Sequence, residues 1–165
     1  MSAQPTGRQR PGAGTAAFVA VTLAVAGYIV KPWEGKRNSV YTDIVGVPTV
    51  CYGSTGKHVS KGQPARTNAE CDRLLNGDLR TAYSAVARCI HHPIAPETAA
   101  ALTSLVFNVG PSGVCGSTLQ RHFNAGNVAQ GCGQLMRWVY AGNQRVQGLV
   151  NRRQAEYRLC MEGMR

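Results

Sequence analysis

The sequence predicts an α+β domain in which helices dominate. Its 165 residues, 44% of them apolar, are enough to build one hydrophobic core. Strand-forming residues gather only between positions 38 and 53, around Gly46 and Pro48. Helix start signals recur after them, beginning with the capping box Thr67-Asn68-Ala69-Glu70. No internal repeat or linker divides the chain beyond residue 31, so we expect a single folded domain there.

The strand-forming stretch, residues 38–53, is interpreted as a small β-hairpin. Pro48 is expected at an edge or a bulge because proline cannot donate a hydrogen bond to a ladder. Residues 54–66 are rich in Gly, Ser and Lys and are expected to form a loop, although a further short strand fits as well.

The remainder of the chain is expected to be helical. The predicted helices cover residues 67–90, 97–109, 117–125, 127–141 and 146–161, with a turn at 110–113. Trp138 is expected in the middle of the fourth helix, as part of the core. Arg152 and Glu156 form an i,i+4 pair on the last helix, whose basic face is expected to be solvated.

The N-terminal region contains a run of 20 residues without a charge, positions 11–30, between Arg10 and Lys31. As a helix of about 1.5 Å per residue, this run is just long enough to cross a bilayer core of about 30 Å. Twelve of the 20 residues are Ala, Gly, Thr or Pro, so insertion would be only marginally favourable.

Three interpretations of this run remain open. It is a signal peptide cleaved after Ala24-Val25-Ala26, a permanent anchor, or a segment that inserts and later leaves the membrane. All three interpretations place residues 31–165 outside the cytoplasm or on the way there.

Charge and cysteine content narrow the class of protein. The net charge of +10 suits a polyanionic partner such as nucleic acid, an anionic membrane or an acidic wall polymer. The six cysteines have no zinc-type spacing and favour disulfides formed in an oxidising compartment, with buried free thiols as the alternative. Their pairing is open, because six cysteines allow about 15 connectivities. An exported, disulfide-bonded chain counts against a nucleic-acid partner.

The segment with candidate chemistry runs from position 34 to 55 and contains Glu34, Asp43 and Thr49. Hydrolysis of a glycosidic bond needs a carboxylic acid that protonates the leaving oxygen and a second carboxylate that activates water or attacks the sugar. The spacing of two acids is weak evidence alone, because exposed charges are the usual explanation.

The full pattern, E-G-x(7)-D-x(2)-G-x(2)-T-x(3)-G, closely resembles the phage-type lysozymes of glycoside hydrolase family 24. The resemblance continues, in order, through CDRLLNGDL, ALTSLVFNVG, CGSTL, FNAG, RWVYAG and GLVNRRQAEYRLC, so that it covers about residues 28–160. It is strongest to the endolysins of lambdoid phages, which often begin with a weakly hydrophobic signal-arrest-release segment.

This resemblance implies a lysozyme-like fold, with a small β-hairpin lobe and a helical lobe around a cleft. It implies that Glu34 is the general acid and that Asp43 and Thr49 hold the attacking water, with inversion at the sugar. Asn108 falls where the family has a polar residue of the cleft, and we expect it to support substrate binding. Ser54 departs from the family, in which many members have histidine at this position. No metal or cofactor is expected.

The resemblance further implies two parts, an N-terminal stub and signal-anchor in residues 1–30 and a catalytic domain in 31–165. We expect an N-acetylmuramidase that is exported by the host secretion machinery, is tethered inactive to the inner membrane and then acts in the periplasm. Its expected partners are peptidoglycan, the membrane and, functionally, a holin or pinholin, and it is expected to be a monomer. The alternatives are a catalytically silent, membrane-tethered wall-binding protein and a secreted inhibitor-type or redox disulfide domain.

Overall fold

The computed structural model describes residues 15–165; the predicted N-terminal stub and positions 11–14 of the uncharged run lie outside the described residues. The elements in chain order are α1 Ala16–Val30, η2 Lys31–Trp33, β1 Arg37–Thr42, β2 Pro48–Cys51, α2 Asn68–Cys89, α3 Pro96–Val109, α4 Pro111–Val114, α5 Thr118–Asn124, α6 Val128–Gly133, η3 Gln134–Arg137, β3 Tyr140–Ala141, β4 Gln144–Arg145 and α7 Gln147–Glu162. The predicted class, mainly helical with a small sheet, is confirmed.

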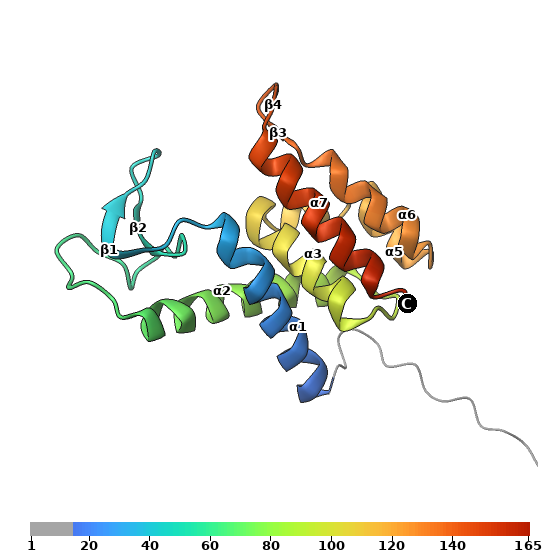
Figure 1. Ribbon diagram of the computed structural model, residues 1–165, viewed down its shortest axis with the longest axis horizontal. Coiled ribbons are helices and arrows are strands. Elements are labelled where there is room, and N and C mark those ends of the chain that lie inside the picture. Colours follow the sequence, from blue (N-terminus) through green and yellow to red (C-terminus); the bar gives the residue numbers. More distant parts are fainter. Residues whose placement is uncertain (1–14) are drawn as a thin grey trace, which may run out of the picture.

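The β1–β2 hairpin forms a small lobe at one end of the molecule, and α2 runs from it to the other helices (Figure 1). Its strands are antiparallel, with Tyr41 opposite Thr49, and β1 carries an irregularity between Arg37 and Tyr41. Pro48 begins β2, a position where its missing N–H costs little. The capping box predicted for the start of α2 is present, since Thr67 accepts from the Glu70 N–H and Glu70 accepts from the Thr67 N–H.

Helix α3 is the centre of the helical lobe, where it packs against α1, α2 and α7 (Figure 1). Every residue from 98 to 106 is buried, so α3 has no solvated face over that stretch. Pro96 occupies its first turn, where a missing N–H is tolerated, so the helix begins one residue before the expected Glu97.

Helix α1 is docked in the folded domain. Its buried residues Thr22, Leu23, Ala26 and Val30 lie on the side that faces α2 and α3. Val21 and Tyr28 are exposed, and the other exposed positions are Thr15 and alanines. The stretch Ala16–Trp33 is also long and apolar enough to cross a membrane, a property it shares with signal sequences and core helices. The same residues therefore suit two environments.

Two sequence predictions in the second half were wrong. Pro111–Val114 forms the short helix α4 rather than a turn, because Pro111 is favourable in a first helical turn. The helix predicted over 127–141 ends at Gly133, continues as η3, and is followed by the β3–β4 hairpin. Gly142, with φ of 57°, makes the tight turn of that hairpin, and Trp138 lies after η3 rather than inside a helix.

All six cysteines form disulfides, as the sequence favoured. The pairs are Cys51–Cys71, Cys89–Cys115 and Cys132–Cys160. The first joins β2 to the start of α2, the second joins the end of α2 to the segment after α4, and the third joins α6 to α7. Each bridge therefore fixes an element against one of the long helices.

Candidate active-site cleft

Glu34 lies at the junction of the two lobes. It follows the single turn of η2 directly and has an extended backbone, which directs the chain away from α1 towards β1. Its side chain lines a cleft of about 500 Å³. The other walls come from the turn after β2, one face of α2 and the end of α3, and include Ser54, Asp78, Ala85 and Asn108.

The Glu34 carboxylate is held by one cation. Arg152 Nη1 lies 2.7 Å from Glu34 Oε1. The Arg152 side chain is 5% exposed and that of Glu34 is 23% exposed, so the contact lies at the edge of the protein interior. Within the described part of the chain, Glu34 Oε2 has no hydrogen-bond partner. One oxygen is thus fixed, and the other is available to a ligand in the cleft.

Behind Arg152 lies a buried ionic group on α7. Arg152, Arg153 and Glu156 are all buried, and Glu156 is completely inaccessible. Glu156 Oε1 accepts from Arg152 Nε at 3.3 Å, from Arg153 Nη2 at 3.1 Å and from the Ser104 hydroxyl at 2.6 Å. Glu156 Oε2 lies 2.9 Å from Arg153 Nε. One carboxylate therefore holds both guanidinium groups.

Burial acts on the charges of this group. It raises the pKa of the Glu156 carboxyl, against the opposing effects of Arg153, Ser104 and Arg152. Burial also lowers the pKa of Arg153 to about 10, which leaves its guanidinium charged at neutral pH. The expectation of a solvated basic face on the last helix is wrong at these positions. The helix turns this part of its surface inwards, where the pairing of opposite charges makes burial tolerable.

Asn108, for which a role in substrate binding is predicted, also lines the cleft. It lies at the end of α3, and its Oδ1 accepts from Arg153 Nη2 at 3.0 Å. The carbonyl of this amide therefore faces the ionic group. The structure brings Glu34 and Asn108 to one cleft and links each of them to an arginine of α7.

Asp43 and Thr49 lie on the hairpin, at the two ends of its loop, and neither is among the residues that line the cleft volume. Asp43 Oδ1 accepts from the N–H groups of Val45 and Val47 at 2.9 and 2.8 Å. The Thr49 hydroxyl donates to the Val47 carbonyl at 3.0 Å. The two predicted site residues are thus joined through Val47, and their juxtaposition with Glu34 remains a prediction.

A tight turn after β2 forms one wall of the cleft. Val50 and Ser54 exchange backbone hydrogen bonds across it, and Cys51 adopts a φ of 60°, unusual for a residue other than glycine. The Ser54 hydroxyl donates to Asp78 Oδ2 at 2.5 Å. Ser54, the position where the chain departs from the resembling family, therefore has a defined partner on α2.

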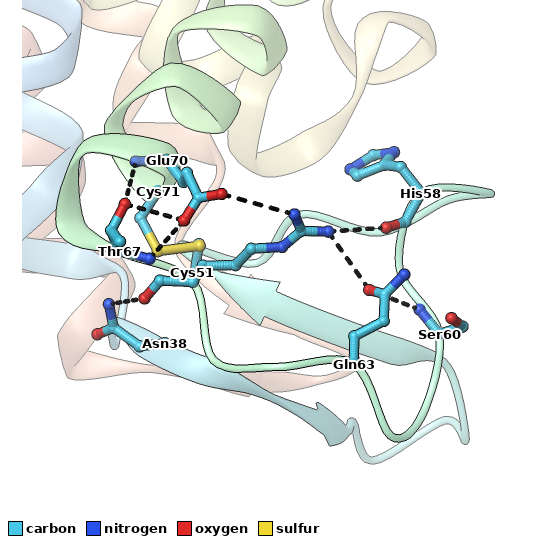
Figure 2. A network of polar contacts seen from close by, with 9 residues as sticks. Asn38, Cys51, His58, Ser60, Gln63, Thr67, Glu70 and Cys71 are labelled. Carbon is cyan, nitrogen blue, oxygen red and sulfur yellow. Dashed lines mark hydrogen bonds and ion pairs between the residues drawn. A yellow bond between two sulfur atoms is a disulfide. The ribbon is translucent and has the colours of Figure 1, made fainter.

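The loop that follows is fastened to the start of α2 and to β1, as Figure 2 shows. The Arg66 guanidinium donates to the His58 carbonyl and to Gln63 and lies near Glu70. Asn38 Nδ2 donates to the Arg66 carbonyl at 2.6 Å, and the Arg66 N–H donates to the Asn38 carbonyl at 2.7 Å. With the Cys51–Cys71 disulfide, these contacts hold the hairpin lobe against α2.

Sequence reasoning paired Arg152 with Glu156 but assigned neither of them, nor Arg153, to this site. Their signal was the pattern R-R-x-x-E, in which both arginines lie within one helical turn of the same glutamate. In residues 15–165, no group of three or more His, Cys, Asp and Glu side chains could hold a metal ion.

Comparisons with a family model, with related sequences and with solved structures all point to the same group of proteins. The family model described as phage lysozyme matches residues 31–156. The chain is 45% identical over 130 residues to the SAR-endolysin of Bacteriophage PS119, covering 79% of this chain and 77% of the relative. It is 38% identical over 154 residues to the SAR-endolysin of Escherichia phage Mu, covering 86% of each. Among solved structures, a mutant of P22 lysozyme superposes with a TM-score of 0.74 at 30% identity, covering 82% of this chain and 94% of that one.

Proposed function

Because this chain belongs to the phage lysozyme family, we propose that it is a lytic endolysin that hydrolyses the β-1,4 bond between N-acetylmuramic acid and N-acetylglucosamine in bacterial peptidoglycan. The observation that carries this proposal is the position of Glu34. Its carboxylate lines a cleft of about 500 Å³, is held by Arg152, and has one oxygen without a hydrogen-bond partner among the described residues.

In the proposed reaction, Glu34 protonates the glycosidic oxygen as the bond to the anomeric carbon breaks. The fixed Oε1 leaves Oε2 as the oxygen that meets the substrate. Asp43 and Thr49 hold the water that attacks the opposite face of the sugar. Asp43 uses Oδ1 for the hairpin loop, which leaves Oδ2 for that water. Asn108 contributes a polar contact to the bound glycan from the α3 wall.

Digestion of purified peptidoglycan tests this proposal. The full-length chain should release muropeptides whose mass shows a reducing N-acetylmuramic acid end, and the first product should be the inverted anomer. A reducing N-acetylglucosamine end would assign the cleavage to the other glycosidic bond, and release of free peptides would assign it to an amide bond. A truncation at Gly27 is unsuitable, because it removes the buried residues Leu23 and Ala26.

We further propose that residues 11–30 act as a membrane anchor, which holds the exported chain inactive at the inner membrane. The segment then leaves the membrane without being cleaved. Two observations support these two roles of the segment, as an anchor and as a part that packs on the catalytic domain proposed for 31–165. The stretch Ala16–Trp33, which contains most of the segment, is long and apolar enough to span, and α1 packs against α2 and α3 in the folded domain. Cleavage after Ala26 would leave a hole beside α3, which argues for retention of the segment.

This arrangement assigns the active enzyme to the periplasm as a monomer, with a holin or pinholin as the functional partner that triggers release. A catalytically silent wall-binding protein of the same fold has no need for a carboxylate with a free oxygen in the cleft. Peptidoglycan digestion also distinguishes that alternative, since such a protein would sediment with the polymer without releasing products.

A further inference from the structure

The buried ionic group on α7 supports the two cleft residues separately. Arg152 reaches Glu34, Arg153 reaches Asn108, and Glu156 holds both arginines. We propose that Arg152 and Arg153 are positioning residues with different tasks. Arg152 fixes the general acid, Arg153 fixes a substrate-binding amide, and Glu156 is their common anchor. This inference rests on the function proposed above.

The first task follows from the geometry of Glu34. Its backbone belongs to a short connection between η2 and β1, so no regular element fixes its side chain. The contact with Arg152 at 2.7 Å joins positions 118 residues apart and fixes the carboxylate from α7. Arg152 is itself constrained, since Nε faces Glu156 and Nη2 donates to the Ser104 carbonyl at 3.4 Å. A guanidinium held at several points is a rigid support for the acid.

The second task follows from the amide of Asn108. Hydrogen bonding of Oδ1 to Arg153 decides which end of the amide faces the ionic group and leaves the Nδ2 donor for the cleft. Arg153 is completely buried and has no direct access to a substrate. The cleft residue that it contacts directly is Asn108, so we assign its influence on substrate binding to that amide.

Charge balance explains why the group is built in this way. Arg152, Arg153 and Glu156 bring two guanidinium groups and one carboxyl group into the interior, and Arg152 also meets the Glu34 carboxyl group at the edge of the interior. An unbalanced charge is strongly unfavourable when it is buried. Docking of the segment that carries Glu34 therefore completes both the active site and the ionic group.

Steady-state kinetics on soluble peptidoglycan fragments test the division of tasks. Arg152→Lys retains the charge but loses the planar fork, and we expect kcat to fall about 10- to 100-fold with little change in KM. Arg153→Lys should raise KM about three- to tenfold with kcat nearly unchanged. Glu156→Gln should affect both constants. Arg158→Lys, an exposed arginine of the same helix, is the matched control and should change neither.

Equal effects of Arg152→Lys and Arg153→Lys on both constants would overturn the division and leave only a structural role. A second measurement does not depend on catalysis. In a double-mutant cycle of Glu34→Gln with Arg152→Lys, the loss of stability of the double mutant should be smaller than the sum of the single losses. Additive losses would show that Arg152 does not hold Glu34. A wild-type protein that leaves peptidoglycan intact but shows this coupling would refute the proposed function and not the contact.

Discussion

Asp43 and Thr49 both bind the backbone of one residue, Val47. The carboxylate of Asp43 accepts from the N–H of Val47, and the hydroxyl of Thr49 donates to the carbonyl of the same residue. The Asp43 N–H also donates to that carbonyl at 3.0 Å. Six residues apart in sequence, the two side chains are therefore set by one loop, and substitutions at either position test how the loop serves the attacking water.

Asp43→Asn should lower kcat about 100-fold or more while the loop survives, because the asparagine Oδ1 still accepts from Val45 and Val47. Thr49→Ser should retain most activity, and Thr49→Val should lower it because the hydroxyl is lost. Turnover and circular dichroism check these expectations. Equal activity of the serine and valine variants would exclude a role for the hydroxyl.

Glu34→Gln should reduce hydrolysis about 10²- to 10⁴-fold, since a positioned acid contributes that much to the rate. Glu97→Gln, at the start of α3 and outside the cleft lining, is the control. Glu156→Gln, which the sequence alone would suggest as an inert control, is unsuitable because Glu156 is buried against Arg152. If the Glu34 variant kept a tenth of the wild-type rate, another group would have to be the acid.

Substitutions on the exposed side of α1 should trap the protein in the membrane. Ala20→Leu with Ala24→Leu makes the helix more apolar at positions that are exposed in the folded domain, so the fold itself is unaffected. We expect this variant to stay in the membrane fraction after the membrane potential is collapsed, whereas the wild type should move to the periplasm and lyse the cell. Ala20→Ser with Ala24→Ser is the matched control.

Gly27 is a poor choice for such a test, because it lies against Leu79. A mature protein that begins at Gly27 would instead indicate cleavage after Ala26.

Reduction of the disulfides should lower the free energy of unfolding by about 2–4 kcal/mol per bridge. Thiol titration of the denatured, unreduced protein should find no free thiol, and peptide mapping should recover the pairs Cys51–Cys71, Cys89–Cys115 and Cys132–Cys160. Alkylation of the native protein should leave turnover unchanged. Inactivation by alkylation alone would point to an accessible, functional thiol.

The contact between the end of α1 and α2 should weaken in acid. Lys31 Nζ lies 2.8 Å from Asp72 Oδ1, and this hydrogen bond lowers the pKa of the Asp72 carboxyl. The stabilisation is therefore present above the usual carboxyl range and disappears as the pH falls through the lowered pKa. Its size is below about 1 kcal/mol because both side chains are about half exposed. Urea unfolding of Asp72→Asn should show less loss of stability between about pH 7 and pH 3 than the wild type. An unchanged loss would mean that the pair does not contribute.

The sequence predicted the structure best where a short local pattern, such as a capping box, is compatible with only one secondary structure. The box from Thr67 to Glu70 caps α2 as expected, and the proline- and glycine-bounded hairpin forms where it was predicted. The prediction failed at 134–141, where several short elements replace a helix because two glycines in α6 and the Gly142 turn outweigh the apolar spacing. Neither outcome required knowledge of distant parts of the chain.

The candidate site likewise contains residues that the sequence predicted and residues that only the tertiary structure reveals. Glu34 and Asn108 were predicted and line one cleft. Arg152 and Glu156 were recognised as a pair, but a spacing on one helix does not tell whether that face meets solvent or protein. The burial of the pair depends on α3 and on Ser104, which is 52 residues away from Glu156 in sequence. Such information exists only in the tertiary structure.

In the proposed release mechanism, the placement of α1 would couple lysis to a partition equilibrium between membrane and folded domain. If the proposed anchor is correct, the residues that pack on α3 are the same ones that would lie in lipid, so one copy of the chain cannot occupy both states. The fraction of active enzyme is then set by the difference between two transfer free energies, and each 1.4 kcal/mol changes the ratio about tenfold. Alanines on the exposed side keep that difference small, because they gain little from lipid and lose little in water. The size of the side chains along this one helix would thus help to set when the enzyme is released and the cell lyses.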